Sequence, residues 1–358
     1  MSEQIRTGLG RVTDAVDTMK EVVYQMVAII FAFLAGALVL YITGYSPVDA
    51  YSAMALGAFG DIFGIGQTLM QATPIIFTSL AFLVTYKAGL FNIGAEGQFL
   101  MGAIAAAFVG IYFEGLPWII HVPLILISSM IAGGLWGLIP AVLKTRFDAH
   151  EVITTMMLTY IAQYFTSYLV NYPLKAPGWV SQTVRLPVSG ELMRILPPTQ
   201  LSSGIYIAGV VVVLVWFLLR KTIFGYELRA IGLNPTAAEN AGININKGVI
   251  ISLVLSGAIA GLGGAVEIMG VHKRFIDGFS PGYGWDGLAV ALVGGLDPFG
   301  SMLASVLFGA LRSGGMIMSR GTGVPLDINT LLQGLVILFV AAPALIRSLL
   351  GRRKKWSQ

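Results

Sequence analysis

The sequence predicts an all-α protein that crosses a lipid bilayer several times. Of its 358 residues, 56% are hydrophobic and only 11% are charged, and the mean hydropathy is +0.80, which is far above the values of soluble domains. Long apolar stretches recur from Val23 to Ala342, and a helix that crosses the hydrocarbon core needs about 20 such residues. The 44 glycines fit this class, because small residues let membrane helices pack closely. Gly133-x-x-x-Gly137 and Gly257-x-x-x-Gly261 are examples.

Ten spans are expected from the hydropathy. The eighth is the shortest, because fourteen residues extend only about 21 Å against a core of about 30 Å. It could dip into the bilayer and return, but the C-terminal basic run would then lie outside, so we interpret it as a short span. The ten expected segments are Val23 to Thr43, Gly66 to Tyr86, Gly97 to Phe113, Ile119 to Leu143, Val152 to Val170, Ser203 to Leu219, Gly248 to Gly270, Tyr283 to Leu296, Phe299 to Met318 and Ile328 to Leu345.

The distribution of basic residues predicts that both termini are cytoplasmic. With the N-terminus inside, 15 of the 22 lysines and arginines fall in the tails or cytoplasmic loops, as the positive-inside rule requires. The other seven, Arg312 among them, are expected outside or at helix ends. The chain then divides into an N-terminal tail (1–22), a transmembrane domain (23–346) and a basic C-terminal tail (347–358).

Two loops are long enough to carry structure. Residues 171–202 contain five prolines and Trp179, which predicts an ordered extracellular segment without a long helix. The cytoplasmic loop 220–247 predicts a helix of about two turns, with Asn234 as its cap, Pro235 in its first turn and Gly242 at its end. On the residues alone this helix could equally be a simple connector.

A short internal repeat suggests inverted symmetry. Gly94-Ala95-Glu96-Gly97 precedes the third span and Gly284-Trp285-Asp286-Gly287 precedes the eighth. The two motifs are five spans apart, and an odd offset places corresponding elements on opposite faces, as in a five-helix inverted repeat.

Glycine-interrupted segments at matching places in two halves point to a solute path. The predicted path residues are Phe91, Asn92, Glu96, Gln98, Tyr283, Trp285 and Asp286. The alternative is that Glu96 and Asp286 stabilise helix N-termini. Four further polar residues within spans, Gln71, Gln163, Glu267 and Gln333, are expected to hydrogen-bond between helices, with Glu267 pairing with Lys273 or Arg274.

Motifs of soluble enzymes are missing from the sequence. It contains no Gly-x-x-x-x-Gly-Lys-Ser/Thr phosphate loop, so an ATPase would be a separate chain. No His-Glu-x-x-His pattern occurs, the three histidines are scattered and there is no cysteine, so we expect neither a metal nor a cofactor. The terminal basic run indicates the cytoplasmic side rather than nucleic-acid binding. Asp148-Ala149-His150-Glu151 predicts a capping box at the start of the fifth span.

Three stretches resemble one family. They are Gly89-Leu90-Phe91-Asn92-Ile93-Gly94-Ala95-Glu96-Gly97-Gln98-Phe99, the loop from Arg229 to Ile243, and Ser256-Gly257-Ala258-Ile259-Ala260-Gly261-Leu262-Gly263-Gly264. They are similar to the branched-chain amino acid, ribose and nucleoside permeases of ATP-binding-cassette (ABC) importers. The extended first motif and Ser280-Pro281-Gly282-Tyr283-Gly284-Trp285-Asp286-Gly287 most resemble the nucleoside permeases.

The resemblance implies a transport subunit of a bacterial plasma membrane, not an enzyme. It implies that the loop from Arg229 to Ile243 is a coupling helix for the ATPase, and the residues concerned are Arg229, Asn234, Pro235, Glu239, Asn240 and Gly242. It also implies a second, homologous permease that forms a heterodimer with this chain, a tandem ATPase that uses ATP and Mg²⁺, and a membrane-anchored solute-binding lipoprotein.

Three alternatives remain at this point. Within the same family the solute could be a simple sugar such as ribose. An ion-coupled secondary transporter would use Glu96 or Asp286 as a proton carrier. A membrane-embedded enzyme lacks a recognisable catalytic cluster in this sequence.

Overall fold

The computed structural model describes residues 25–341, and in this range every regular element is a helix. The all-α class is thereby confirmed. The two tails predicted at 1–22 and 347–358 lie outside the described residues, as do the first residues of the expected first span and the last residues of the tenth.

Seven helices are long and apolar enough to cross a membrane, because each offers about 20 residues to the hydrocarbon core. They are Gln25–Ile42, α3 (Ile62–Lys87), α4 (Ala95–Tyr112), α5 (Trp118–Phe147), α7 (Gly204–Lys221), α10 (Ile245–Glu267) with its π-helical extension η2 (Ile268–His272), and α12 (Pro298–Thr322). The membrane prediction is confirmed for these seven, whereas ten spans are not. The remaining expected spans correspond to α6 (Glu151–Asn171), which is less apolar, α11 (Tyr283–Val293) and α13 (Leu326–Ala341), which are short.

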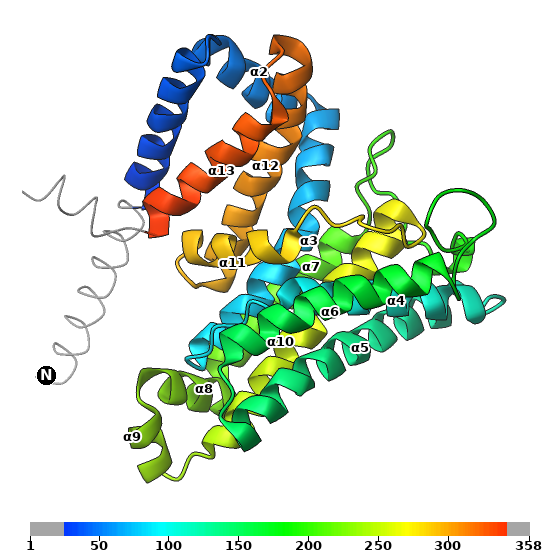
Figure 1. The fold of residues 1–358 in the computed structure, drawn as a ribbon, viewed down its shortest axis with the longest axis vertical. Coiled ribbons are helices and arrows are strands. Elements are labelled where there is room, and N and C mark those ends of the chain that lie inside the picture. Colours follow the sequence, from blue (N-terminus) through cyan, green and yellow to red (C-terminus); the bar gives the residue numbers. More distant parts are fainter. Residues whose placement is uncertain (1–24, 342–358) are drawn as a thin grey trace, which may run out of the picture. The chain divides into compact units, whose positions relative to one another are not determined.

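The described residues fold as two compact units, residues 58–313 and residues 25–57 with 314–341. In the larger unit α10 packs against α3, α4 and α5, and α4 also contacts α5 and α6 (Figure 1). Glycine makes the closest of these contacts possible. A Cβ atom on Gly257 of α10 would lie 2.2 Å from the carbonyl oxygen of Gly133 of α5, a distance that no side chain tolerates. The two glycine pairs singled out in the sequence therefore belong to facing helices, as small residues at membrane-helix contacts do.

The smaller unit contains Gln25–Ile42, α13 and parts of α2 (Pro47–Phe59) and α12. The Tyr51 hydroxyl of α2 donates to the carbonyl of Phe33 at 2.7 Å, and Gly36 lies directly against the side chain of Leu332. Helix α2 was not predicted. Its thirteen residues are too few to be found by a search for spans of about 20 apolar residues.

The loop 171–202, which the sequence places outside and which is called the outer loop below, agrees with the prediction of an ordered segment without a long helix. Its only regular piece among the described residues is the 3₁₀ turn η1 (Val188–Gly190). Backbone hydrogen bonds join it to the chain that follows α10: the N–H of Thr183 donates to Phe275 at 2.9 Å and that of Leu186 to Lys273 at 2.8 Å. The loop is therefore held by the segment that leads into α11.

The predicted capping box at Asp148 is wrong. Asp148 ends α5 in the left-handed conformation, with φ 50°, and α6 begins at Glu151 without a side-chain cap. Both carboxylates instead pair with Lys144, Asp148 at 3.3 Å and Glu151 at 3.4 Å. The acidic residues follow the C-terminus of one helix, where a lysine of its last turn reaches them, so ion pairing replaces capping.

Candidate functional site

The site is built around the loop between α3 and α4, which Asn92 holds in place. The buried Asn92 amide donates to the Gln98 side chain at 3.1 Å and to the Ser256 hydroxyl of α10 at 2.9 Å. Its carbonyl oxygen accepts from the backbone N–H of Gly94 at 2.8 Å. The Asn92 side chain thus accepts a hydrogen bond from the loop backbone and donates to α4 and α10. These bonds account for the burial of Asn92.

Glu96 connects the two repeated motifs directly. Its buried carboxylate accepts a hydrogen bond of 2.5 Å from the backbone N–H of Gly284, in the first turn of α11. A Cβ on Gly284 would lie 2.2 Å from the backbone nitrogen of Glu96, so this glycine permits the close approach of α11 to α4. The carboxylate therefore lies at a helix N-terminus, as the alternative interpretation expected, but at that of the other repeat rather than its own.

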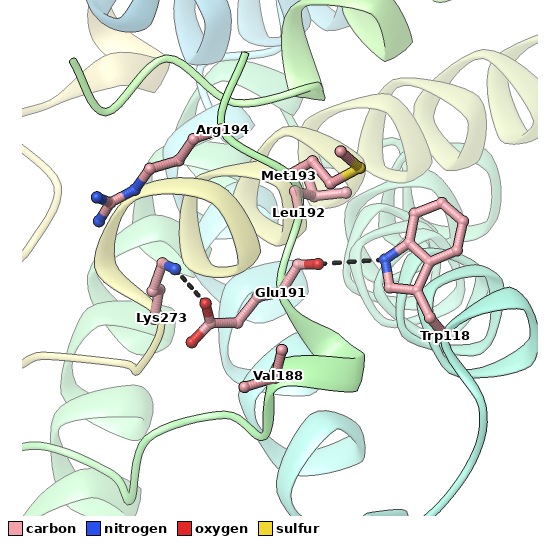
Figure 2. Close-up of a pocket in the computed structure, with 7 residues that line it drawn as sticks. All are labelled: Trp118, Val188, Glu191, Leu192, Met193, Arg194 and Lys273. Atoms are coloured by element: carbon pink, nitrogen blue, oxygen red, sulfur yellow. Dashed lines mark hydrogen bonds and ion pairs between the residues drawn. The ribbon is translucent and has the colours of Figure 1, made fainter. Parts of the chain in front are cut away.

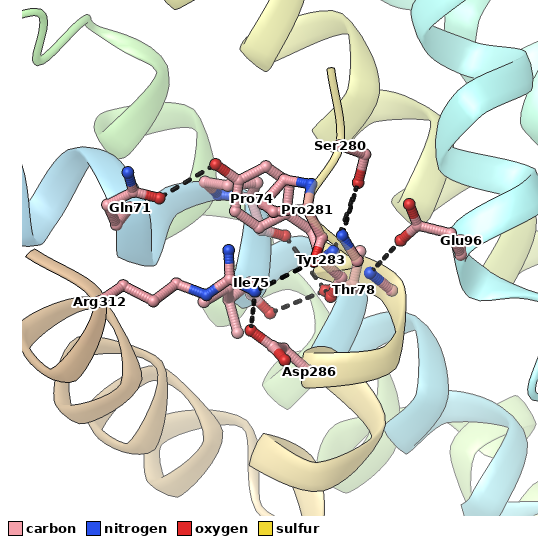
Figure 3. A network of polar contacts seen from close by, with 12 residues as sticks. Gln71, Pro74, Ile75, Thr78, Glu96, Ser280, Pro281, Tyr283, Asp286 and Arg312 are labelled. Carbon is pink, nitrogen blue, oxygen red and sulfur yellow. Dashed lines mark hydrogen bonds and ion pairs between the residues drawn. The ribbon is translucent and has the colours of Figure 1, made fainter. Parts of the chain in front are cut away.

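Tyr283 and Asp286 of α11 take part in a second polar cluster (Figure 3). The Tyr283 hydroxyl donates to Gln71 at 3.0 Å, and its carbonyl accepts from the Thr78 hydroxyl at 2.8 Å. Asp286 pairs with Arg312 at 2.6 Å, and the Arg312 guanidinium lies 5.1 Å from the centre of the Tyr283 ring. This cluster joins α3, α11 and α12 of the larger unit.

Arg312 and Gln71 complete the cluster but were not among the predicted path residues. Arg312 was expected outside the membrane or at a helix end, whereas it lies within α12, with its side chain 15% exposed. An isolated arginine in an apolar run requires a buried partner. That requirement was the available signal, but the sequence did not identify which acid is the partner.

The remaining predicted path residues are aromatic and more accessible. Phe91 is half-buried and packs edge-on against Phe82, with ring centres 5.1 Å apart. Trp285 is 37% exposed. Of the seven predicted residues, Asn92, Glu96, Gln98 and Tyr283 are buried and Asp286 is engaged by Arg312, so most of the set is held by protein partners.

Glu267 was expected to pair with Lys273 or Arg274, and this is wrong. Its buried carboxylate lies 3.4 Å from the imidazole of His272. Lys273 instead pairs with Glu191 of the outer loop. The π-helical turn between Glu267 and Lys273 changes the register of the chain and thereby selects the histidine.

Lys273 pairs with Glu191 beside a pocket of about 340 Å³ (Figure 2). Arg185 pairs with this carboxylate at 2.9 Å. Burial acts to raise the pKa of Glu191, but hydrogen bonds and charge from Lys273 and Arg185 outweigh it and hold the pKa below its ordinary value. The Lys273 pair fastens this loop to the chain that follows η2, and the Arg185 pair lies within the loop.

The predicted coupling segment comprises two helices rather than one, α8 (Ile223–Leu233) and α9 (Pro235–Asn240). Asn234 caps α9 by accepting from the N–H of Ala237 at 3.1 Å, Pro235 occupies its first turn, and Gly242 follows with φ 85°. These three expectations are confirmed. Glu239 and Asn240 are exposed on α9.

The other predicted coupling residue belongs to α8. Arg229 donates from its guanidinium to the carbonyl of Leu219 near the end of α7. This contact fastens the start of the coupling segment to a long helix.

Gly232 of α8 meets the loop that leads to the polar site. A Cβ on Gly232 would lie 2.4 Å from the carbonyl oxygen of Lys87, and one on Gly89 would lie 3.1 Å from the Cα of Gly232. The chain from Lys87 through Gly89 continues to Asn92 and Glu96. A displacement of α8 would therefore act directly on the backbone that positions the buried polar residues.

Comparison with known proteins gives a consistent result. The family described as branched-chain amino acid transport system / permease component matches residues 64–341. The guanosine ABC transporter permease protein NupP of Bacillus subtilis is 41% identical over 345 residues, which cover 95% of this chain and 99% of the relative. No solved structure matches the chain significantly.

Two further relatives are less similar and differ in their named solutes. The nucleoside ABC transporter permease protein NupB of Lactococcus lactis is 34% identical, with 94% of each chain covered. The glucose ABC transporter permease protein TsgB13 of Haloferax volcanii is also 34% identical, over 88% of this chain and 86% of the relative.

Proposed function

The chain belongs to the permease component family of branched-chain amino acid transport systems, and from this we propose that it is the membrane-spanning subunit of an ABC importer for nucleosides. The observation that carries the proposal is the 41% identity to a guanosine permease over almost the whole of both chains. The chain is a multi-pass membrane protein of a transport family, and its curated relatives are transport subunits rather than enzymes.

The decisive experiment is uptake by the complete importer, assembled from this chain, its companion permease, ATPase and solute-binding protein. Labelled guanosine, another nucleoside and glucose are compared in cells that lack their own uptake systems. We expect saturable, ATP-dependent nucleoside uptake that excess glucose does not inhibit. Glucose uptake without nucleoside uptake would support the sugar alternative, which the similarity to TsgB13 favours. Uptake without an ATPase that an uncoupler abolishes would indicate a secondary transporter.

The proposed orientation places both termini in the cytoplasm of a bacterium and retains ten crossings. Support for the short eighth crossing comes from two ion pairs. Ten residues before it Lys273 pairs with Glu191 of the outer loop, and just after its end Asp297 pairs with Arg220 at 2.8 Å. Arg220 lies in the last turn of α7, which begins just after the outer loop. The chain from Lys273 to Asp297 thus traverses the length of α7, partly as extended chain and partly as α11.

Support for the five-helix inverted repeat comes from its two motifs. Each opens a helix, α4 at Ala95 and α11 at Tyr283, and the two helix starts meet at Glu96 and Gly284. Discontinuous helices that meet in this way occur around the solute sites of transporters with inverted repeats.

For the solute path we propose that some of the predicted residues hold the helices in place and that another contacts the solute. Asn92, Glu96 and Gln98, together with Tyr283 and Asp286, hold the helix ends beside the path, because their polar groups already have protein partners. Trp285, with its greater exposure, is available to stack on a flat base. Glu96→Ala and Trp285→Ala separate these roles when uptake and protein abundance are both measured. We expect Glu96→Ala to reduce the amount of folded protein. We expect Trp285→Ala to reduce uptake per folded molecule.

For energy coupling we propose that α8 and α9 contact a separate tandem ATPase, which binds ATP and Mg²⁺. Two observations support this proposal: α9 is exposed, and Gly232 of α8 contacts Gly89. Movement of the ATPase would displace α8 and, through this contact, the loop at Asn92. ATP binding would then switch the permease between two states, in which the solute site is open to opposite sides of the membrane. Glu239→Lys, on the exposed face, should abolish uptake while leaving the permease folded. Normal uptake in this variant would remove the assignment.

A further inference from the structure

Helix α6 carries its small residues inside and its large residues outside. The buried side consists of Thr155, Thr159, Ala162, Thr166 and Val170. Helix α4 approaches so closely that a Cβ on Gly97 would lie 2.8 Å from the Cα of Thr159. The threonine hydroxyls are satisfied by carbonyls of α6 itself, as for Thr166 with Ala162 at 2.8 Å. The inner face is therefore complete without further partners.

The outer face presents a row of tyrosines among exposed apolar side chains. Tyr160, Tyr164 and Tyr168 are 42%, 77% and 57% exposed, and Tyr172 follows directly after the helix end. Residues four apart on a helix lie above one another on one face, so these rings form a continuous strip. The rings of Tyr168 and Tyr172 are 5.2 Å apart.

With α6 as the fifth of the ten proposed crossings, half of this strip lies at mid-membrane depth. The 21 residues of α6 extend about 31 Å, which places Tyr160 about 13 Å and Tyr164 about 20 Å from its start. Tyrosines are common at the two membrane interfaces, which accounts for Tyr168 and Tyr172 but not for the other two. In the described part of the chain, neither the Tyr160 nor the Tyr164 hydroxyl has a hydrogen-bond partner, and the half-exposed Gln163 amide beside them has none either.

Such a face is unsuited to lipid. Hydroxyl and amide groups in the hydrocarbon core are costly unless they find a partner or water. Helix α6 also exposes the apolar side chains of Met157, Ile161 and Phe165. Helix α7 differs because its exposed residues at mid-length are all apolar: Val210, Val213, Leu214 and Phe217. The lower hydropathy of α6, which keeps it out of the apolar spans, comes from both faces, because threonines lie inside and the tyrosines and Gln163 lie outside.

We propose that the outer face of α6 lines the hydrated solute path, opposite the companion permease, and that Tyr160, Tyr164 and Gln163 contact the solute. A row of aromatic rings offers successive stacking surfaces to a flat nucleobase, and the Gln163 amide can donate to and accept from its polar edge. The inference rests on the proposed nucleoside function for the identity of the solute, but not for the presence of water.

The absence of cysteine from the chain permits a direct test of hydration. Tyr164→Cys and Leu214→Cys are each placed in the complete importer and exposed in cells to a membrane-impermeant methanethiosulfonate reagent, and labelling of this chain is then quantified. Only a thiol in contact with water ionises and reacts. We expect Tyr164→Cys to react at least tenfold faster than the α7 control, and excess nucleoside to slow it. Equal resistance of both positions would overturn the inference.

Transport kinetics test the contact with the solute. Tyr164→Leu, which removes the ring, should raise the KM for nucleoside uptake about tenfold, as expected for loss of one stacking contact. Tyr164→Phe keeps the ring and should stay within about twofold of the parent protein. An unchanged KM in Tyr164→Leu with normal abundance would exclude stacking at this position.

The two proposals fail in distinguishable ways. If the parent importer takes up no nucleoside, the proposed function fails, whereas rapid labelling at position 164 still locates a hydrated path. If nucleoside uptake is normal but position 164 resists the reagent and Tyr164→Leu transports normally, only the assignment of α6 fails.

Discussion

The backbone N–H of Gly284 donates a hydrogen bond to the buried carboxylate of Glu96, 188 residues earlier in the chain. This contact joins the start of α11 to the first turn of α4 and thereby joins the two copies of the Gly-x-acid-Gly motif. A side chain on Gly284 would occupy the space of the Glu96 backbone. The relationship therefore depends both on the acid and on the absence of a side chain opposite it.

Gly284→Ala should prevent correct folding of the larger unit. The added Cβ would lie 2.2 Å from the Glu96 nitrogen, and backbone of this kind cannot move aside without disrupting α4. We expect the yield of monodisperse protein in detergent to fall to a small fraction of the parent level. Gly209→Ala in α7 is the matched control, because no atom lies within 4 Å of its Cβ position. Equal yields for the two variants would contradict the proposed packing role.

Arg312→Met should destabilise the protein strongly. The substitution leaves the mostly buried Asp286 carboxylate without its partner, and breaking such a pair costs about 3 to 5 kcal/mol. Thermal unfolding in detergent, followed by fluorescence, would measure the effect.

The double variant with Asp286→Asn should recover part of the loss, because no unpaired charge then remains. Arg320→Met serves as control on the same helix, since Arg320 is exposed and an exposed change costs less than about 0.5 kcal/mol. A small effect for Arg312→Met, comparable with this control, would show that the ion pair contributes little.

Gly232→Ala should uncouple ATP hydrolysis from uptake. The new methyl group would meet the Lys87 carbonyl oxygen at 2.4 Å and push α8 away from the loop that carries Asn92. We expect the assembled importer to retain ATPase activity while uptake falls at least about tenfold, a change in coupling on the scale of 1.4 kcal/mol. Simultaneous assays of phosphate release and nucleoside uptake measure both, and unchanged uptake would show that this contact transmits no force.

The Glu191 ion pairs should make stability depend on pH in the acidic range. The pKa of Glu191 in the folded protein is held below its ordinary value of 4.5, so the unfolded chain binds a proton more readily. The stabilisation is therefore present above this ordinary, unfolded pKa and is lost as the pH falls through the lower folded value. Glu191→Gln should lower the melting temperature at pH 7, and the difference from the parent protein should shrink below about pH 4. A difference that stays constant with pH would exclude the charge as its cause.

The membrane class, the all-helical fold, the outer loop without a long helix and the cap of α9 were determined by the sequence itself. Each depends on local chemistry. Runs of apolar residues demand a bilayer, and Asn234, Pro235 and Gly242 act on their own backbone. The family likewise followed from contiguous motifs.

Tertiary structure decided which partners the polar residues find. Glu96 lies against Gly284 rather than on its own helix end, Glu267 against His272, and Asp286 against Arg312. Burial forces each of these groups to find a partner, but several candidates are equivalent in sequence, and only the packing of α3, α4, α10, α11 and α12 chooses among them. The same holds for α6, where periodicity could indicate a row of tyrosines but only the close approach of α4 on the opposite side turns that row outward.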